Sequence, residues 1–205
     1  MYVPRLYRNE NIDEIITHIH NANFGIIISV ENNQAVATHI PFVVFKKGNY
    51  LHLQFHVSKA NPQTKNWSLA NDVLVIFQGA HSYISASWYD HENVSTWNYI
   101  AIHVYGNIRP LDELETLAHL QDLVHQHEKH ETNPIDFNQY NKSYIEQESK
   151  GLLAYEIQAK SIYSAFKLSQ NRDTKNYAII IEELVKRGDE NSLAIAQAMR
   201  MRTLT

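Results

Sequence analysis

The spacing of apolar residues changes several times along this chain, and each change predicts a new secondary-structure element. Near the start, isoleucines recur at helical spacing and predict a helix from Asn11 or Asp13 to about Ala22. Three segments rich in β-branched and aromatic residues follow: Phe24–Val30, Ala35–Phe45 and Tyr50–Val57. Short polar turns separate these segments, so they predict a three-stranded meander.

A second helix and three further strands are predicted from the middle of the chain. The helix extends from Lys59 to Ala70 with Trp67 on its inner face, and Pro62 places its first turn near Asn61. The strands are Val73–Gln78, His81–Trp88 and Trp97–Ile108. Gly79-Ala80 and the polar residues 89–96 separate them.

The second half of the chain is mostly helical. Pro110 and Asp112 open a helix to about Lys129. Its predicted apolar face consists of Leu114, Leu117, Leu120, Leu123 and Val124. A short helix within residues 133–150 and a strand over Gly151–Ala165 follow, and the chain then forms two helices, Thr174–Arg187 and Glu190–Met201.

This order of elements predicts an α+β fold built round an antiparallel β-barrel, with flanking helices and a C-terminal helical hairpin. We expect one domain over residues 1–172 and a helical extension over 173–205, packed on the barrel or on a dimer partner. The length allows one substantial core.

Composition and charge exclude several classes of protein and of functional site. The chain carries 18 basic and 22 acidic residues, a formal charge of −4, which lacks the positive field of a protein held on DNA by its phosphates. The absence of cysteine excludes disulfides, thiolate metal sites and cysteine nucleophiles. The apolar runs are too short to span a bilayer, and no signal peptide is apparent, so we expect a cytoplasmic protein that does not enter the membrane.

Four stretches, taken in order, resemble the PaiB family of FMN-binding negative transcriptional regulators. They are Ala37–Pro41, His56–Gln63, Ala80–Tyr89 together with Val94–Tyr99, and Lys167–Arg172. The resemblance implies a flavin-reductase-like split β-barrel that dimerises, with FMN in grooves at the dimer interface.

Several of these residues suit the phosphate and ribityl chain of FMN. Thr38 and His39 lie in a strand, while Lys59 and Asn61 lie at the predicted helix start, where free N–H groups favour an anion. The hydroxyl of Ser85 could bond phosphate or ribityl oxygens. The alternative for Thr38 and His39 is an ordinary half-buried pair of strand residues. For Lys59 and Asn61 it is a helix start that is exposed to solvent.

Aromatic and amide groups suit the isoalloxazine ring. Trp97 and Asn98 form a candidate platform against the flavin of the partner subunit, although tryptophans also serve as core. Lys167, Gln170 and Arg172 could clamp phosphate or the pyrimidine edge of the flavin. The alternative for this stretch is a solvated turn that caps the next helix.

We predict neither a metal site nor a catalytic residue. His52 and His56 share a strand face and His39 could lie across from them, but no carboxylate accompanies them at ligand spacing. The histidines of residues 125–130 are expected at a solvated helix end. The sequence contains no G-x-S-x-G elbow and no G-x-G-x-x-G loop.

The expected function is an FMN-binding, homodimeric negative regulator of transcription rather than an enzyme. The last two helices have the length of a helix-turn-helix, but their acidic residues and apolar stripes favour packing over direct DNA reading. Two alternatives remain open. One is an FMN-dependent oxidoreductase, flavin reductase or haem-binding split-barrel enzyme, and the other is a barrel that has lost its cofactor.

Overall fold

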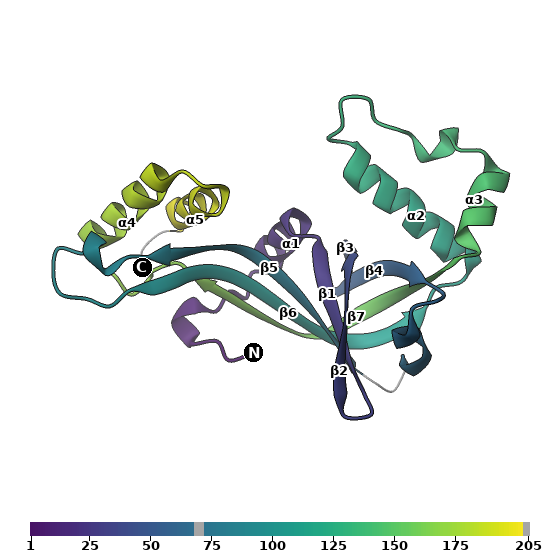
Figure 1. The fold of residues 1–205 in the computed structure, drawn as a ribbon, viewed down its shortest axis with the longest axis horizontal. Coiled ribbons are helices and arrows are strands. Elements are labelled where there is room, and N and C mark those ends of the chain that lie inside the picture. The colour runs from purple at the N-terminus through teal and green to yellow at the C-terminus, as the bar shows by residue number, and fades with distance from the viewer. Residues whose placement is uncertain (68–71, 203–205) are drawn as a thin grey trace. The chain divides into compact units, whose positions relative to one another are not determined.

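The computed structural model describes residues 1–67 and 72–202. Over these residues the chain forms a seven-stranded sheet of order β2-β1-β5-β6-β7-β4-β3 with five α-helices (Figure 1). The strands are β1 Phe24–Glu31, β2 Gln34–Pro41, β3 Val43–Lys47, β4 Tyr50–Ser58, β5 Asp72–Ile84, β6 Thr96–Pro110 and β7 Leu152–Lys167. The helices are α1 Ile12–Asn21, α2 Glu113–Glu128, α3 Lys142–Ser149, α4 Thr174–Arg187 and α5 Glu190–Arg200. The α+β class and the antiparallel sheet are confirmed.

The chain divides into two compact units. The terminal unit comprises Met1–Asn21, Gln78–His103 and Tyr163–Thr205, and the central unit comprises Ala22–Phe77 and Val104–Ile162. The long strands β5, β6 and β7 each contribute residues to both units. No helix among residues 1–67 and 72–202 has the length and hydropathy needed to cross a membrane.

Two hairpins replace the predicted meander in the central unit. Strand β1 pairs with β2 through a turn in which Asn32 and Asn33 both have positive φ, the backbone that two-residue hairpins require. Strand β3 pairs with β4, which in turn pairs with β7. The expected single strand over Ala35–Phe45 is therefore wrong, because the chain breaks at Phe42 between β2 and β3.

Packing explains the break at Phe42. Its side chain is fully buried, and its ring centroid lies 5.3 Å from those of both Phe55 and Phe77. Its N–H donates to the carbonyl of Asn23 at 2.9 Å. Burying one large aromatic ring among two others stabilises the fold more than one further residue of backbone pairing between strands would. Strand β2 also approaches β4, so this part of the sheet curls.

The helix predicted over Lys59–Ala70 is wrong in its described part. Only a 3₁₀ turn, Pro62–Asn66, is formed, and residues 68–70 lie outside the described chain. The side chain of Asn61 caps this turn by accepting from Gln63 N. Trp67 follows it, packed edge-on against Phe55 at 5.6 Å between ring centroids.

Strand β5 is continuous where two strands were expected. Gly79 does not form a turn but lies within the strand, where an added Cβ would stand 3.1 Å from Cβ of Ile100. The glycine therefore serves close packing of neighbouring strands. The predicted strand His81–Trp88 ends at Ile84, and Ala86–Trp88 form a 3₁₀ turn capped by Ser85.

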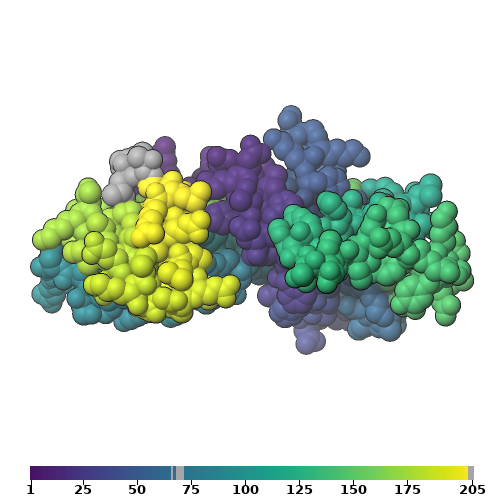
Figure 2. Space-filling view, turned by 90° about the horizontal axis from the view of Figure 1, so that it is seen from above, coloured from purple at the N-terminus to yellow at the C-terminus, as the bar shows by residue number. Residues whose placement is uncertain are grey.

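The terminal unit places the hairpin of α4 and α5 on its strands. Gly188, with φ of 73°, ends α4, and Asp189 caps α5. Figure 2 shows the two helices, in yellow-green and yellow, as one continuous layer. Their inner residues join the strand residues Ile84, Ile100 and Phe166 in one core; these are Tyr177, Ile180, Leu184, Ile195, Ala196 and Met199. Helix α1 buries Ile15 and Ile19, as its isoleucine spacing predicts.

Helix α2 begins as predicted but buries an unexpected face. Asp112 and Glu115 form a capping box at its start. Leu114, predicted on the apolar face, is 79% exposed, whereas His119 is the buried residue of this helix. The other predicted leucines are only half-buried. The helix therefore buries a polar side chain, His119, more completely than any of its apolar residues.

Candidate functional site

An apolar strip covers the outward face of the first strands in the central unit. On β1, Phe24 and Val30 are 63% and 68% exposed. The other members of the strip are the half-buried residues Ile26 and Ile28 of β1 and Ile76 and Leu74 of β5. Directly paired residues share a face of an antiparallel sheet, and the register pairs Ile26 with Ile76 and Ile28 with Leu74. A contiguous exposed apolar surface of this kind marks an interaction site.

His39 borders the apolar strip. It pairs with Ile26 in the ladder, is exposed, and stacks on Phe24 with ring centroids 6.4 Å apart. The predicted binding residue His39 therefore lies on the face where a ligand or second molecule would meet the strip.

Thr38 and Asn61, two of the predicted site residues, lie in one hydrogen-bond network centred on Gln63. Thr38 Oγ1 donates to Gln63 Oε1 at 2.6 Å and accepts from Asn61 Nδ2 at 3.1 Å. Gln63 Nε2 donates to Ser29 Oγ at 2.9 Å and to the carbonyl of Val36 at 3.2 Å. Gln63 is fully buried, so it fixes the 3₁₀ turn onto β1 and β2.

Lys59 and Asn61 do not lie at the N-terminus of an α-helix, as the prediction of an anion site there requires. The chain forms only a five-residue 3₁₀ turn there, which lacks the dipole of an α-helix. Lys59 is exposed just after β4, and Asn61 uses its amide oxygen to cap the turn. Their contact with FMN stays a prediction, without the support of a helix dipole.

The terminal unit exposes a group of aromatic rings. Trp97 is 51% exposed and lies 5.8 Å from Tyr83 and 6.1 Å from His81 between ring centroids. We call Trp97, Tyr83 and His81 the aromatic group. Ser85 follows the last residue of β5, with its Oγ 2.8 Å from Ser87 Oγ. The rings are inclined to one another, at 66° for Trp97 and Tyr83, so the half-exposed indole of Trp97 is the surface on which a planar ligand could stack.

Asn98 and Gln170, predicted to contact the flavin, are engaged within the chain. Asn98 is fully buried and exchanges hydrogen bonds with Ser169 Oγ at 2.9 and 3.0 Å. Gln170 accepts from Leu168 N and donates to the carbonyl of Phe166. Both amides thus shape the turn after β7, in which Ser169 has a positive φ.

Lys167 and Arg172 place two cations at the same turn. Lys167 Nζ donates to Thr96 Oγ1, and burial, together with the charge of Arg172, lowers the pKa of Lys167. Arg172 lies over the ring of Tyr89 at 4.7 Å. Within residues 1–67 and 72–202 neither cation joins an ion pair, and both Arg172 Nε and Tyr89 Oη are buried without a partner. Buried donors without partners are costly, which favours an acceptor from a ligand.

The histidines considered for a metal are separated by the fold. His39 stacks on Phe24, His52 Nδ1 lies 3.3 Å from Glu156 Oε1, and His56 pairs with His119. Across the described part of the chain, no three histidine, aspartate or glutamate side chains gather as a metal site would require.

Sequence reasoning missed the polar layer beneath α2, which contains His119, Arg109 and Glu156. Two signals were available in the sequence. Glu115 and His119 stand four apart on one helix face, and polar residues alternate along β4 at His52, Gln54 and His56. Neither signal says that these faces meet.

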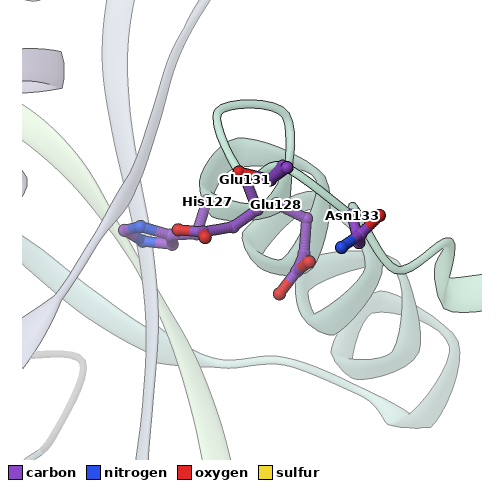
Figure 3. A pocket seen from close by; sticks show the side chains of 5 residues that line it. His127, Glu128, Glu131 and Asn133 are labelled. Carbon is purple, nitrogen blue, oxygen red and sulfur yellow. The ribbon is translucent and has the colours of Figure 1, made fainter.

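A shallow pocket of about 350 Å³ lies at the C-terminal end of α2. It is lined by His127, Glu128, Glu131, Thr132 and Asn133 (Figure 3). Figure 3 shows the His127 and Asn133 side chains extending in opposite directions, so they do not converge on a point. The polar lining lacks the apolar wall that an isoalloxazine ring needs.

Solved structures with the same fold include flavin proteins. The FAD and haem binding protein from Mycobacterium smegmatis aligns with a TM-score of 0.59 at 12% identity, covering 89% of this chain and 80% of that chain. The flavocytochrome Anf3 from Azotobacter vinelandii also gives 0.59, at 14% identity, covering 86% and 78%. At these identities the likeness shows the fold alone, and the fold is that of the flavin-binding split barrels.

Sequence comparison identifies the family. The family described as a putative FMN-binding domain matches residues 1–161. The protease synthase and sporulation protein PAI 2 of Bacillus subtilis (strain 168) is 36% identical over 199 residues, which cover 97% of this chain and 96% of the relative. This chain belongs to the putative FMN-binding domain family, and the predicted resemblance to PaiB is confirmed.

Proposed function

We propose that this protein binds FMN as a homodimer and acts as a regulator rather than as a catalyst. The observation that carries the proposal is the apolar strip, whose Phe24 and Val30 stand open to solvent beside His39. The choice of FMN as the ligand rests on membership in a family of putative FMN-binding domains.

The apolar strip supports the dimer. A symmetric dimer buries the same patch of both subunits, and such interfaces are apolar at their centre. The strip offers isoleucine, leucine, valine and phenylalanine side chains, and none of the β2 residues paired with its β1 members is an aspartate, glutamate, lysine or arginine. A second copy laid against it would shield these side chains from water.

Features of the terminal unit support a flavin as ligand. The aromatic group offers a stacking surface, and Lys167 and Arg172 offer two cations with free donor capacity. A phosphate dianion needs such charge-assisted donors, while the isoalloxazine needs an apolar or aromatic wall. When bound, FMN would supply the redox chemistry of its ring.

The regulatory part of the proposal is supported by the relationship to the relative named protease synthase and sporulation protein PAI 2. Helices α4 and α5 use their apolar residues for the core of the terminal unit, and the chain is acidic overall. Both features favour control through a ligand or partner over strong direct reading of DNA. A gel shift at physiological salt tests the DNA part, and retardation by a specific operator would contradict this preference.

The visible spectrum and the molar mass of the purified protein test the proposal. We expect bands near ~375 and ~450 nm after addition of FMN, and light scattering should give twice the chain mass. A Soret band would instead identify a haem protein. A monomer whose spectrum shows no bound FMN would refute the proposal, and rapid NADH oxidation by the flavin-loaded protein would refute the regulatory role.

Replacing Lys167 and Arg172 together with glutamine should weaken FMN binding by about 10²- to 10⁴-fold, because each of the two charge-assisted bonds to phosphate contributes about 1.5–3 kcal/mol. Riboflavin, which has no phosphate, should bind both proteins equally. Fluorescence titration with each flavin measures the difference.

The matched control replaces two exposed cations outside this turn, Arg5 and Lys142, with glutamine. An equal loss of FMN affinity in the control, or an equal loss of riboflavin affinity in the Lys167/Arg172 variant, would exclude the phosphate role.

A further inference from the structure

Polar contacts near both ends join helix α2 to the sheet of the central unit. Arg109 on β6 binds Glu115 of the helix in bidentate fashion at 2.8 and 2.9 Å. The same guanidinium donates to Glu156 on β7 at 2.9 and 3.0 Å. Near the other end of the helix, Gln126 Nε2 donates to the carbonyl of Phe42 at 3.1 Å.

Between these two anchors, the helix buries a histidine against a histidine. His119 is fully buried, and its Nε2 lies 3.1 Å from Nδ1 of His56 on β4. The two rings meet edge to face, with centroids 5.3 Å apart and planes at 66°. One ring nitrogen must carry a proton and the other must accept it, so the contact requires at least one neutral ring.

The second ring nitrogen of His119, Nδ1, is poorly placed to carry a proton. His119 Nδ1 is buried and has no hydrogen-bond partner in the described part of the chain. If His119 gains a proton, Nδ1 becomes a charged donor without an acceptor, which is costly in a site closed to water. The neutral pair is therefore the state that this geometry accommodates.

Among residues 1–67 and 72–202, no carboxylate contributes to the pKa shift of either ring. Glu115, one helical turn before His119, is bound by Arg109, whose hydrogen bonds lower the pKa of Glu115 to about 2. Glu156 on β7 is shared between Arg109, Gln54 and His52. Asp122, the next acidic residue of α2, is exposed. The positive charge of Lys47 also lowers the pKa of Glu115.

We propose that His56 and His119 form an acid-sensitive clasp, which holds α2 on the sheet while both rings are neutral and releases the helix when the pair takes up protons. The device does not depend on FMN and adds a response to acidity that the proposed function lacks. Burying one helix on a titratable pair makes its docking a two-state element.

The direction of the response follows from the pKa shifts. Burial, and then the charge of His56, lowers the pKa of His119 to about 4, and burial also lowers the pKa of His56. A released helix returns both rings to water, where a histidine has a pKa near ~6.5. The released state thus binds protons more tightly, so docking is fully stable above about pH 6.5 and weakens as the pH falls toward 4.

Hydrogen exchange followed by mass spectrometry tests the clasp. After correction for the intrinsic pH dependence of exchange, opening of residues 113–128 should rise about 70-fold between pH 7.5 and 4.5 from His119 alone. Strand β5 of the same chain should show no comparable rise. An α2 segment that keeps its protection at pH 4.5 would overturn the proposal.

Two variants separate the pair from the rest of the helix. His56→Gln/His119→Gln keeps amide groups that can hydrogen-bond and removes both titrations, so its α2 exchange should no longer depend on pH. His125→Gln changes an exposed histidine of the same helix and should respond like the parent protein. An acid response that persists in the double variant, or disappears in His125→Gln, would contradict the clasp.

A direct titration covers the case in which the double variant loses its helix at neutral pH. Nuclear magnetic resonance of the imidazole carbons in the unaltered protein should show His119 neutral down to about pH 5. If His119 instead titrates near pH 6.5 while α2 remains protected, the proposal is wrong.

Discussion

Replacing Gly106 with alanine should lower the free energy of unfolding by about 3 kcal/mol. Gly106 is buried in β6, and an added Cβ would stand 2.2 Å from the carbonyl oxygen of Gln158 and 2.8 Å from Cγ2 of Ile157. Backbone atoms of β7 cannot turn aside as a flexible side chain can, so the two strands must separate. Urea denaturation monitored by circular dichroism measures the loss.

Gly151→Ala is the matched control. There the added Cβ meets only the carbonyl oxygen of Glu148, at 3.5 Å, which is an ordinary van der Waals contact. The control should match the parent protein within about 0.5 kcal/mol. Equal stability of the two alanine variants would show that β6 and β7 are not as close at Gly106 as the structure has them.

Gln63→Ala should cost about 3 kcal/mol, because Gln63 is fully buried and its amide joins three elements. The substitution leaves Thr38 Oγ1 without its acceptor and removes the donor to Ser29 Oγ and the Val36 carbonyl. A buried polar atom that loses its partner retains the full cost of its lost hydration. Chemical denaturation at neutral pH checks the value.

Gln34→Ala provides the comparison for this substitution. Gln34 lies at the exposed start of β2, and its replacement should change stability by no more than about 0.5 kcal/mol. If Gln63→Ala is as harmless as Gln34→Ala, the network around Thr38 does not fix the turn, and the location of the predicted residues Thr38 and Asn61 would have to be reconsidered.

Local signals in the sequence predict much of this fold. Helices α4 and α5 were expected within one residue of their observed ends, because Asp189 and Gly188 mark the boundary chemically. The errors concern residues whose role is set at long range. Gly79 has the composition of a turn, but it accommodates Ile100 on the neighbouring strand, and Phe42 ends β2 to enter a cluster with Phe55 and Phe77.

The candidate site, too, could be predicted from the sequence only in part. The motifs located Thr38 and Asn61, and the structure brings these two side chains into one network. The apolar strip was not predicted as an exposed surface, because its isoleucines have the spacing of an ordinary buried strand. His119 was missed because its helix was assigned a leucine face, and only the fold shows which side of α2 meets β4.

The proposed dimer would tie the folding of the chain to its concentration, because Phe24 and Val30 are exposed in the single chain. If a second copy covers the apolar strip, association stabilises the folded chain by mass action, and the thermal midpoint should rise as the concentration is increased. Dilution would then do more than separate subunits. It would expose the apolar strip to water, since no segment among the described residues of the same chain covers Phe24 and Val30. Each separated chain would then be less stable and more prone to aggregate.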